Sequence, residues 1–447
     1  MQHYCIQNFI AKLLVEHGLL EISYSMNSAE SVVASRNATW FCCPKAISIS
    51  SDIRIQTYHS IYDVPRKEWC TVVPENHILL QYDFLAGIEN AHRAELGFRY
   101  LVIFEHNRPI MTVCCQIVTF NTEKIRPFTQ NAAASTFWEK TKNFVSYQFA
   151  ELASSVDVRM LVCGNVFLSG QLGICYGEGV EEAKAFSLLN DALEKVRQDE
   201  KAAGKRIWAT LAKDFPPHAA LPAKEYGYHP FSVEPIMTMN LPKEWKNFDD
   251  YLSALASKYR QRVKSTYKKS QVLTYKELSL EEVEQNTPLM RELFLSVVGK
   301  AGFNLQESAD DYLVHLKRSM GDKYYIRGYY LEDKMLAFMS ILKTGEHEIE
   351  AHFLGYSDED NHEYKIYQRI LYDIIQYGIE NQMRDISFGR TAMEIKTTVG
   401  AVPNEMNLYL QLSFPVVNRL AGPVMKNLKQ PVWQPRHPFK GQEEQND

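Results

Sequence analysis

A chain of 447 residues is longer than one hydrophobic core usually supports, and its 45% hydrophobic and 12% aromatic content suffices for two cores. Its formal net charge of −5 argues against a general DNA or RNA binder, because such proteins need a basic surface to neutralise phosphates. All eight cysteines lie at or before Cys175 and none forms a C-x-x-C pair. The composition therefore predicts no metal site and no disulfide framework, and it favours a reducing cytoplasm.

The first 48 residues open with an apolar run, but Lys12, Glu16 and His17 interrupt it and no cationic segment precedes it. This pattern predicts an amphipathic helical extension over 1–48 and not an export signal. No stretch of the chain approaches the roughly 20 uncharged residues that a membrane-spanning helix needs. We therefore expect a cytoplasmic protein without a transmembrane segment, for which contact with a membrane can only be peripheral.

Residues 49–243 alternate between strand-like and helix-like patterns. Apolar residues at every second position predict strands, whereas apolar residues three or four apart predict helices. A turn at 106–109 separates two apolar runs and predicts a β-hairpin. In chain order we expect a strand at 52–57, a helix at 77–94, the hairpin at 100–120, a helix at 135–153, a strand at 158–168, a helix at 180–202 and strands at 206–212 and 229–241.

Residues 244–438 repeat much of this order, after a joint at 240–247. One helix over 360–381 carries an isoleucine stripe at helical spacing, with Asp360 or Asn361 placed to cap its start. The last residues, 439–447, form an acidic tail. In chain order we expect a basic helix at 247–270, a strand at 272–278, helices at 287–299 and 308–319, strands at 323–332, 334–345 and 347–357, the helix at 360–381, a strand at 384–389, a short helix and a strand at 405–413.

Two stretches of the second half carry a resemblance to a known family. The helix "SKYRQRVKSTYKKSQ" at 257–271 looks like the basic helix that opens the second domain of FemAB-like proteins, and residues 366–401 are similar to the helix, strand and turn of that branch. The order of elements resembles the GNAT superfamily of acyltransferases. The resemblance implies an α+β fold with two tandem GNAT-like domains, 49–243 and 244–438, each a mixed, mostly antiparallel sheet flanked by helices. It also implies that the second domain bears the active site.

One expected motif is missing from the second half. A typical CoA-binding GNAT domain has a Q/R-x-x-G-x-G/A loop before a helix, where backbone N–H groups hold the pyrophosphate. Residues 355–368 occupy that place here, and they are acidic and lack a second glycine. In the first half, Gly177 and Gly179 precede a helix and offer an alternative cofactor-binding cradle, although three neighbouring glutamates oppose an anion.

The strand at 347–357 carries the candidate catalytic residues. Alternation places Glu348, Glu350 and His352 on one face of this strand. Amine acylation needs a base whose pKa lies near neutrality, and the resemblance places the general base of many GNAT enzymes on this strand. Glu350 and His352 are our candidates; the alternative is an exposed sheet face whose charges point to water. A tyrosine that returns a proton to a leaving thiolate is the second expected catalyst, with Tyr367 preferred over its neighbours.

The strand at 384–389 ends on a cation. Arg390 follows it directly, with Thr391 next, and Lys396 lies on the following short helix. If this strand ends at a substrate groove, the guanidinium can hold a carboxylate or a phosphate with two parallel hydrogen bonds. The alternative is that both cations pair with nearby acids such as Glu394 or cap carbonyl groups.

The helix near 258–269 concentrates six cations and two tyrosines. In Fem-type ligases a helical arm in this region contacts the transfer RNA donor, so the resemblance keeps transfer RNA open as a partner. A solvated helix face, or contact with anionic lipid or with the phosphates of CoA, are the alternatives.

We expect an N-acyltransferase that moves an acyl group from acyl-CoA to a primary amine by direct attack. Acyl-CoA is then a co-substrate, and no tightly bound cofactor is expected. The alternatives are a Fem-type transferase that uses aminoacyl-tRNA and acts on a cell-wall precursor, and a non-catalytic ligand-binding protein that keeps the fold. Donor, acyl length and acceptor are not readable from the residues.

Overall fold

The structure is a computed structural model that describes residues 52–121, 157–170, 172–217, 219, 221–298, 310–426 and 433–441. The predicted extension at 1–48, the predicted helix at 135–153 and most of the acidic tail lie outside these residues. None of the helices in these ranges is long and apolar enough to cross a bilayer. The same ranges contain no group of three histidine, cysteine or acidic residues that could hold a metal ion.

The first sheet is built mainly from the first half of the chain. Its strands follow the order β1-β2-β3-β4-β6-β15-β7, and β5 pairs with residues 111–113 of β3, next to the stretch that pairs with β4. All neighbours are antiparallel except β4 and β6, which run parallel. The strands are β1 (Ile53–Tyr58), β2 (Leu96–Glu105), β3 (Arg108–Asn121), β4 (Asp157–Cys163), β5 (Ile174–Tyr176), β6 (Ala209–Phe215), β7 (His229–Ser232) and β15 (Asn407–Leu412).

The second sheet has the order β14-β8-β13-β12-β11-β10-β9. Its one parallel pair among the described strands is β12 with β13. The predicted strands at 323–332, 334–345 and 347–357 are confirmed as β10, β11 and β12. The strands are β8 (Ile236–Asn240), β9 (Thr274–Glu277), β10 (Tyr324–Leu331), β11 (Lys334–Lys343), β12 (Glu348–Tyr356), β13 (Asp385–Ser387) and β14 (Val402–Asn404).

The two sheets exchange strands. β8 precedes residue 243 but pairs with β13 and β14 of the second sheet. β15 follows residue 244 but lies between β6 and β7 of the first sheet. The boundary at 243/244 stays a prediction, and each sheet contains a strand from the other side of it.

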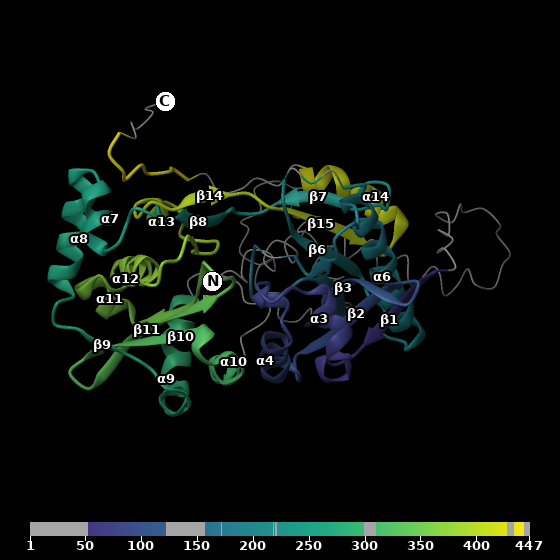
Figure 1. Ribbon diagram of the computed structural model, residues 1–447, viewed down its shortest axis with the longest axis horizontal. Helices are drawn as coiled ribbons and strands as arrows, with labels where there is room; N and C mark the ends of the chain where they lie inside the picture. The colour runs from purple at the N-terminus through teal and green to yellow at the C-terminus, as the bar shows by residue number, and fades with distance from the viewer. Residues whose placement is uncertain are drawn as a thin grey trace, which may run out of the picture.

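Helices cover both sheets, and the two halves of the chain lie side by side (Figure 1). α4 and α10 lie next to each other where the halves meet, and α8 lies on the far edge of the second half. The helices are α3 (Arg66–Val72), α4 (Tyr82–His92), α6 (Glu182–Ala202), α7 (Phe248–Ala254), α8 (Ser257–Lys269), α9 (Leu280–Val298), α10 (Tyr312–Met320), α11 (Asp358–Tyr364), α12 (Ile366–Glu380), α13 (Met393–Thr397) and α14 (Pro415–Lys426), with short 3₁₀ turns at Ile61–Asp63, Ile78–Leu80 and Gly321–Lys323.

The long basic helix predicted over 247–270 is wrong as one element. Leu255 and Ala256 are extended, so the chain forms α7 and α8 with a break between them. Leu255 is fully buried and bridges Phe439, and the Ala256 N–H donates to the Pro438 carbonyl. Pairing with the distant C-terminal segment therefore replaces the helical hydrogen bonds at this point.

The helix predicted over 360–381 is likewise two helices. Lys365 adopts a left-handed conformation with φ 57° and separates α11 from α12. The Asn361 side chain accepts a hydrogen bond from the Tyr367 N–H, so it satisfies a free donor at the start of α12. The isoleucine stripe of α12 is buried, as its spacing predicted.

One hydrophobic core runs through both halves of the chain. It packs Trp69 and Phe84 of the first half together with Tyr312, Leu316 and Phe338 of the second. A second core lies between the other face of the second sheet and α7, α8 and α12. The junction of β12 and β13, in the middle of the second sheet, lies between these cores, and the candidate site is found there.

Candidate functional site

β12 and β13 begin as a parallel pair and then separate. Three residue pairs are in register, from Glu348 with Asp385 to Glu350 with Ser387. β12 continues for six more residues to Tyr356, whereas β13 ends at Ser387. The two backbones therefore enclose a wedge-shaped opening beyond Glu350.

A narrow cavity occupies this opening. The space open to a water-sized sphere is about 30 Å³, which holds a water molecule but no larger ligand. Five of the predicted site residues line it, so the structure brings them together. The lining residues are Phe294, Val297, Ala351, His352, Phe353, Leu354, Tyr367, Leu371, Ile374, Phe388, Arg390, Thr391 and Lys396.

His352 is held by two tyrosines. The Tyr324 hydroxyl lies 2.9 Å from Nδ1 of the imidazole, and the Tyr312 hydroxyl lies 3.1 Å from Nε2. Tyr324 also donates to Ser340 Oγ at 3.0 Å, and Ser340 in turn bridges the N–H and the carbonyl of Phe353. Because Tyr324 donates its single hydroxyl proton to Ser340, its oxygen must accept the hydrogen bond from Nδ1–H of His352. Nε2 is then the acceptor for Tyr312, and His352 is neutral.

Burial lowers the pKa of His352 to about 3. The ring is only 8% exposed, and a charged imidazole loses its hydration there. The prediction of a histidine base with a pKa near neutrality is therefore wrong. The neutral ring instead joins Tyr312 of α10 to Tyr324 of β10.

Glu350 shares the face of β12 with His352, as the alternation predicted. Burial raises the pKa values of Tyr312 and Tyr324, and the Glu350 carboxylate adds a smaller contribution to both, so it lies near them. Glu350 is 2% exposed, whereas Glu348 at the start of the strand is exposed. The alternative of a charged face that points to water is thus wrong for Glu350 and His352. Glu350 does not line the cavity.

Tyr367 lines the cavity from the first turn of α12, and its hydroxyl is buried. Within the described part of the chain this hydroxyl has no hydrogen-bond partner. Burial raises its pKa, with a smaller contribution from Tyr356, so the group is a protonated donor near neutral pH. A buried hydroxyl without a partner is costly, and such groups in native proteins call for an explanation.

Arg390 is not free to hold a substrate anion. Its side chain is 0% exposed, and its guanidinium donates to Asp214 Oδ1 at 2.9 Å, to Ser169 Oγ at 3.3 Å and to the Glu234 carbonyl. Asp214 belongs to β6 of the first sheet. The contacts correct the predicted anion clamp: Arg390 pairs with an acid of its own chain, although not with Glu394.

Lys396 holds the loop that follows β13. Its Nζ donates to the Arg390 carbonyl at 2.5 Å and to the Gly389 carbonyl at 3.2 Å. Thr391 and Ala392 both have positive φ angles, of 66° and 47°, which is a strained conformation for residues with a Cβ. Lys396 thus binds backbone carbonyl groups, which was the alternative to anion binding that the sequence analysis gave.

The loop at Gly177 and Gly179, the one predicted pyrophosphate cradle, is poorly suited to an anion, and the second half lacks the pyrophosphate loop, as its sequence predicted. The Gly177 N–H donates to the Ile110 carbonyl of β3, and the first turn of α6 is acidic. In the second half, α11 begins with three acidic residues, and Asn361 occupies the start of α12. The first expectation, that Gly177 and Gly179 hold the cofactor, is therefore corrected, since one donor is used and negative charge surrounds the helix start.

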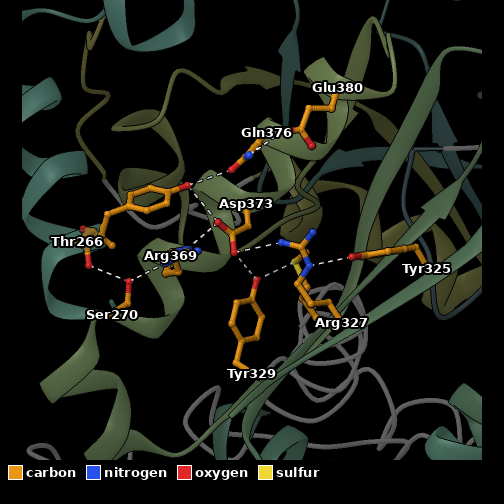
Figure 2. Close-up of polar contacts among 11 residues, drawn as sticks. Thr266, Ser270, Tyr325, Arg327, Tyr329, Arg369, Asp373, Gln376 and Glu380 are labelled. Carbon is orange, nitrogen blue, oxygen red and sulfur yellow. Dashed lines mark hydrogen bonds and ion pairs between the residues drawn. The ribbon is translucent and has the colours of Figure 1, made fainter. Parts of the chain in front are cut away.

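The basic helix α8 packs against α12 through a polar network. Tyr267 of α8 donates to Asp373 Oδ1 at 3.1 Å, and Arg369 and Arg327 bind the same carboxylate (Figure 2). Arg369 also reaches Ser270 at the end of α8. The lysines of α8 lie on its outer, exposed side, and none of its residues lines the cavity.

The sequence did not single out Tyr312, Tyr324, Ser340 or Asp214. Tyrosine is common in this chain, and nothing in the spacing distinguishes the two that contact His352. Only the register of β10 with β11, which pairs Ile326 with Ser340, brings Tyr324 and Ser340 close together.

No protein-family model and no curated protein matches the sequence. Solved structures are similar at low identity. FemX has a TM-score of 0.48 at 10% identity, over 82% of this chain and 99% of that one. A tandem GNAT protein from the clavulanic acid biosynthesis pathway has a TM-score of 0.46 at 9% identity, over 81% and 99%. A probable N-acyltransferase from Enterococcus faecalis V583 has a TM-score of 0.40 at 10% identity, over 83% and 74%.

The topology itself decides the fold class. In the second half one strand, two helices, three antiparallel strands, a helical crossover and a parallel strand follow one another as predicted. The first half has its own parallel pair, β4 with β6, joined through α6. The chain thus has the predicted fold class, with two mixed sheets flanked by helices in a tandem GNAT-like arrangement.

Proposed function

We propose that this protein is an N-acyltransferase that moves an acyl group from an acyl-CoA thioester to a primary amine at the cavity between β12 and β13. The observation that carries the proposal is the buried Tyr367 hydroxyl, which lines this cavity and has no hydrogen-bond partner among the described residues. A leaving group that needs a proton accounts for such a donor.

The reaction forms one C–N bond and breaks one C–S bond. The amine nitrogen attacks the thioester carbonyl carbon, and the thiolate departs. Tyr367 gives its hydroxyl proton to the thiolate sulfur. Glu350, which lies on the same face of β12 as the lining residue His352 but does not itself line the cavity, takes the proton that the nitrogen loses through one intervening water molecule. Exchange with solvent returns a proton to Tyr367 and removes one from Glu350.

His352 acts as a positioning residue in this scheme. It fixes the hydroxyls of Tyr312 and Tyr324 on the face of β12 that also carries Glu350. Their pKa values, raised mainly by burial, keep both tyrosines protonated. Both hydroxyl protons are already used, on Ser340 and on Nε2 of His352, so the two tyrosines orient His352 and do not donate to the acceptor amine.

The size of the cavity favours a small acyl group. Phe294, Leu371 and Ile374 give it an apolar lining, but its volume of about 30 Å³ requires the walls to part before a donor enters. The acidic start of α11 disfavours a pyrophosphate there, so the nucleotide end of the donor binds elsewhere.

Ligand-induced stabilisation and thiol release test the proposal together. Acetyl-CoA should raise the melting temperature, because a ligand that binds the folded state stabilises it. With a panel of primary amines, the protein should release free CoA. Stabilisation by aminoacyl-tRNA alone would favour the Fem-type alternative, and binding of acyl-CoA without turnover of any amine would favour a ligand-binding protein.

The matched variants are Tyr367→Phe and Tyr364→Phe. Both remove one hydroxyl, and Tyr364 lies on α11 outside the cavity lining. We expect Tyr367→Phe to lower kcat by about 100-fold, as loss of a general acid does, with little change in KM. Tyr364→Phe should keep the wild-type rate. Equal rates for both variants would refute the role of Tyr367.

A further inference from the structure

A second, larger hollow lies at the other end of α12. About 440 Å³ of it is open to a water-sized sphere, which falls within the roughly 300–1,000 Å³ range of small-molecule sites. It is formed by the loop after β8, the turn between β11 and β12, and the end of α12. The lining residues are Leu241, Pro242, Lys243, Trp245, Lys246, Glu346, His347, Ile379, Glu380, Gln382, Met383 and Arg384.

The floor of this hollow is apolar. Leu241, Ile379 and Met383 are buried in the second core. Trp245 is partly buried, and its ring packs edge-on against Tyr251 with centroids 5.5 Å apart. An aromatic wall over aliphatic side chains suits the apolar body of a ligand.

The frame of the hollow is tied by backbone hydrogen bonds. The Leu241 N–H donates to the Arg384 carbonyl at 2.6 Å, and the Arg384 N–H donates to the His347 carbonyl at 2.8 Å. The Met383 N–H donates to the Gly378 carbonyl, which ends α12. Three chain segments are thereby fixed to one another, so the site is formed before a ligand binds.

Positive charge dominates the rim. Within the described part of the chain, the side chains of Lys243 and Arg384 have no hydrogen bond and no ion pair, and the ammonium of Lys246 contacts only the Lys243 carbonyl at 2.8 Å. Of the two acids, Glu346 lies 3.8 Å from His347, and Glu380 accepts a hydrogen bond from Gln376 at 2.7 Å (Figure 2). Three permanent cations thus face two carboxylates that already have partners.

We propose that this hollow binds an amphipathic anion, with a carboxylate or phosphate held by Arg384 and Lys243 and an apolar body against Trp245 and Met383. Arg384 offers the forked donor geometry that suits both head groups. The site is distinct from the cavity between β12 and β13. Tyr367 lies at the start of α12 and Glu380 at its end, roughly 20 Å apart at 1.5 Å per residue.

Four ligands distinguish the contribution of the anionic head group to binding from that of the apolar chain. Decanoate and decyl phosphate carry both an apolar chain and an anionic head, decanol lacks the charge, and inorganic phosphate lacks the chain. Binding is measured by calorimetry on the full chain and by tryptophan fluorescence, with Trp245→Phe to assign the signal. We expect the two amphipathic anions to bind at least about tenfold more tightly than decanol or phosphate. Equal binding of decanol would refute the charge requirement, and tight binding of phosphate alone would refute the apolar one.

Opposite charge changes at the rim should act in opposite directions. Arg384→Gln should weaken binding of decanoate by about tenfold, and Glu346→Gln should strengthen it. Lys264→Gln, an equal loss of positive charge on the exposed face of α8, is the matched control and should leave binding unchanged. If Arg384→Gln behaves like Lys264→Gln, or if Glu346→Gln weakens binding, the proposed site is wrong. Binding should also persist in Tyr367→Phe, which makes it independent of the proposed acyltransfer.

Discussion

The Arg390 guanidinium and the Asp214 carboxylate lie 2.9 Å apart, and both side chains are 0% exposed. Arg390 follows β13 of the second sheet, and Asp214 lies in a bulge of β6 in the first sheet, where it has a φ angle of 65°. The ammonium of Lys213 binds the other oxygen of the same carboxylate at 2.7 Å. One acid from the first half of the chain therefore joins two cations from different sheets.

Asp214→Asn should strongly destabilise the protein. It leaves the buried charges of Arg390 and Lys213 without an ionic partner, which costs about 3–5 kcal/mol when one member of a buried pair is removed. The free energy of unfolding in urea measures this cost. Asp333→Asn, at an exposed turn, should change it by less than about 0.5 kcal/mol.

Arg390→Lys distinguishes a structural role from ligand binding. A lysine keeps the charge but cannot reach Ser169, Asp214 and the Glu234 carbonyl together, so we expect lost stability with unchanged ligand affinity in the fraction that folds. A stable variant with weakened acyl-CoA binding would restore the anion-clamp hypothesis.

Tyr367→Phe should separate stability from activity. Removing a buried hydroxyl that has no partner relieves a desolvation cost, so we expect unchanged stability or a gain of up to about 1 kcal/mol. The same variant should lose most of its acyltransfer. Thermal unfolding and a thiol-release assay on one preparation measure both quantities. A clear loss of stability would show that the hydroxyl has a structural partner.

Stability should fall as the pH decreases below 6.5. The pKa values of His352 and His92 are lowered by burial from 6.5 to about 3, so the unfolded chain binds these protons first. Each histidine leaves the free energy of unfolding unchanged above pH 6.5. Between pH 6.5 and pH 3 it lowers this free energy by up to about 1.4 kcal/mol per pH unit. The slope of the unfolding free energy between pH 6 and pH 5 measures this effect.

Single variants test whether His352 and His92 cause this pH dependence. His352→Gln and His92→Gln should each reduce the slope by the contribution of one histidine, and the double variant should reduce it by both. His92 stacks on Phe167 with ring centroids 3.9 Å apart, so His92→Phe is a second variant that keeps an aromatic ring in place. An unchanged slope in the double variant would contradict the account.

The strand exchange predicts that the chain cannot be divided at residue 243. Without β15, the first sheet loses the link between β6 and β7, and without β8 the second loses the link between β13 and β14. Fragments 49–243 and 244–438 should therefore aggregate or stay unfolded when produced separately, as circular dichroism and size exclusion would reveal. Two folded monomers would support a boundary without shared strands.

The sequence predicted where strands lie along the chain better than it predicted which strands and side chains contact one another. Apolar runs separated by turn residues located β10, β11 and β12 closely, because these strands are largely buried and β11 is buried at almost every position. The sequence could not show that β8 and β15 change sheets, since the same pattern suits either neighbour. Nor could it find the partner of Arg390, which lies 176 residues away in the chain.

For the candidate site, too, the sequence predicted which residues come together but not what each side chain contacts. Five predicted residues line one cavity because they follow two adjacent strands and the start of one helix, which is a consequence of topology. What each side chain does depends on groups that the local sequence does not name. Burial and two tyrosines set the state of His352, and Asp214 of the other sheet occupies Arg390.

The placement of β15 has a consequence for synthesis on the ribosome. Residues 407–412, which form β15, leave the exit tunnel long after β6 and β7. Until then, the edges of β6 and β7 that pair with β15 have no partner strand. The nascent first sheet therefore stays incomplete until residues 407–412 have emerged from the tunnel. Until then, the unpaired edges of β6 and β7 are where chaperones would bind or aggregation would begin.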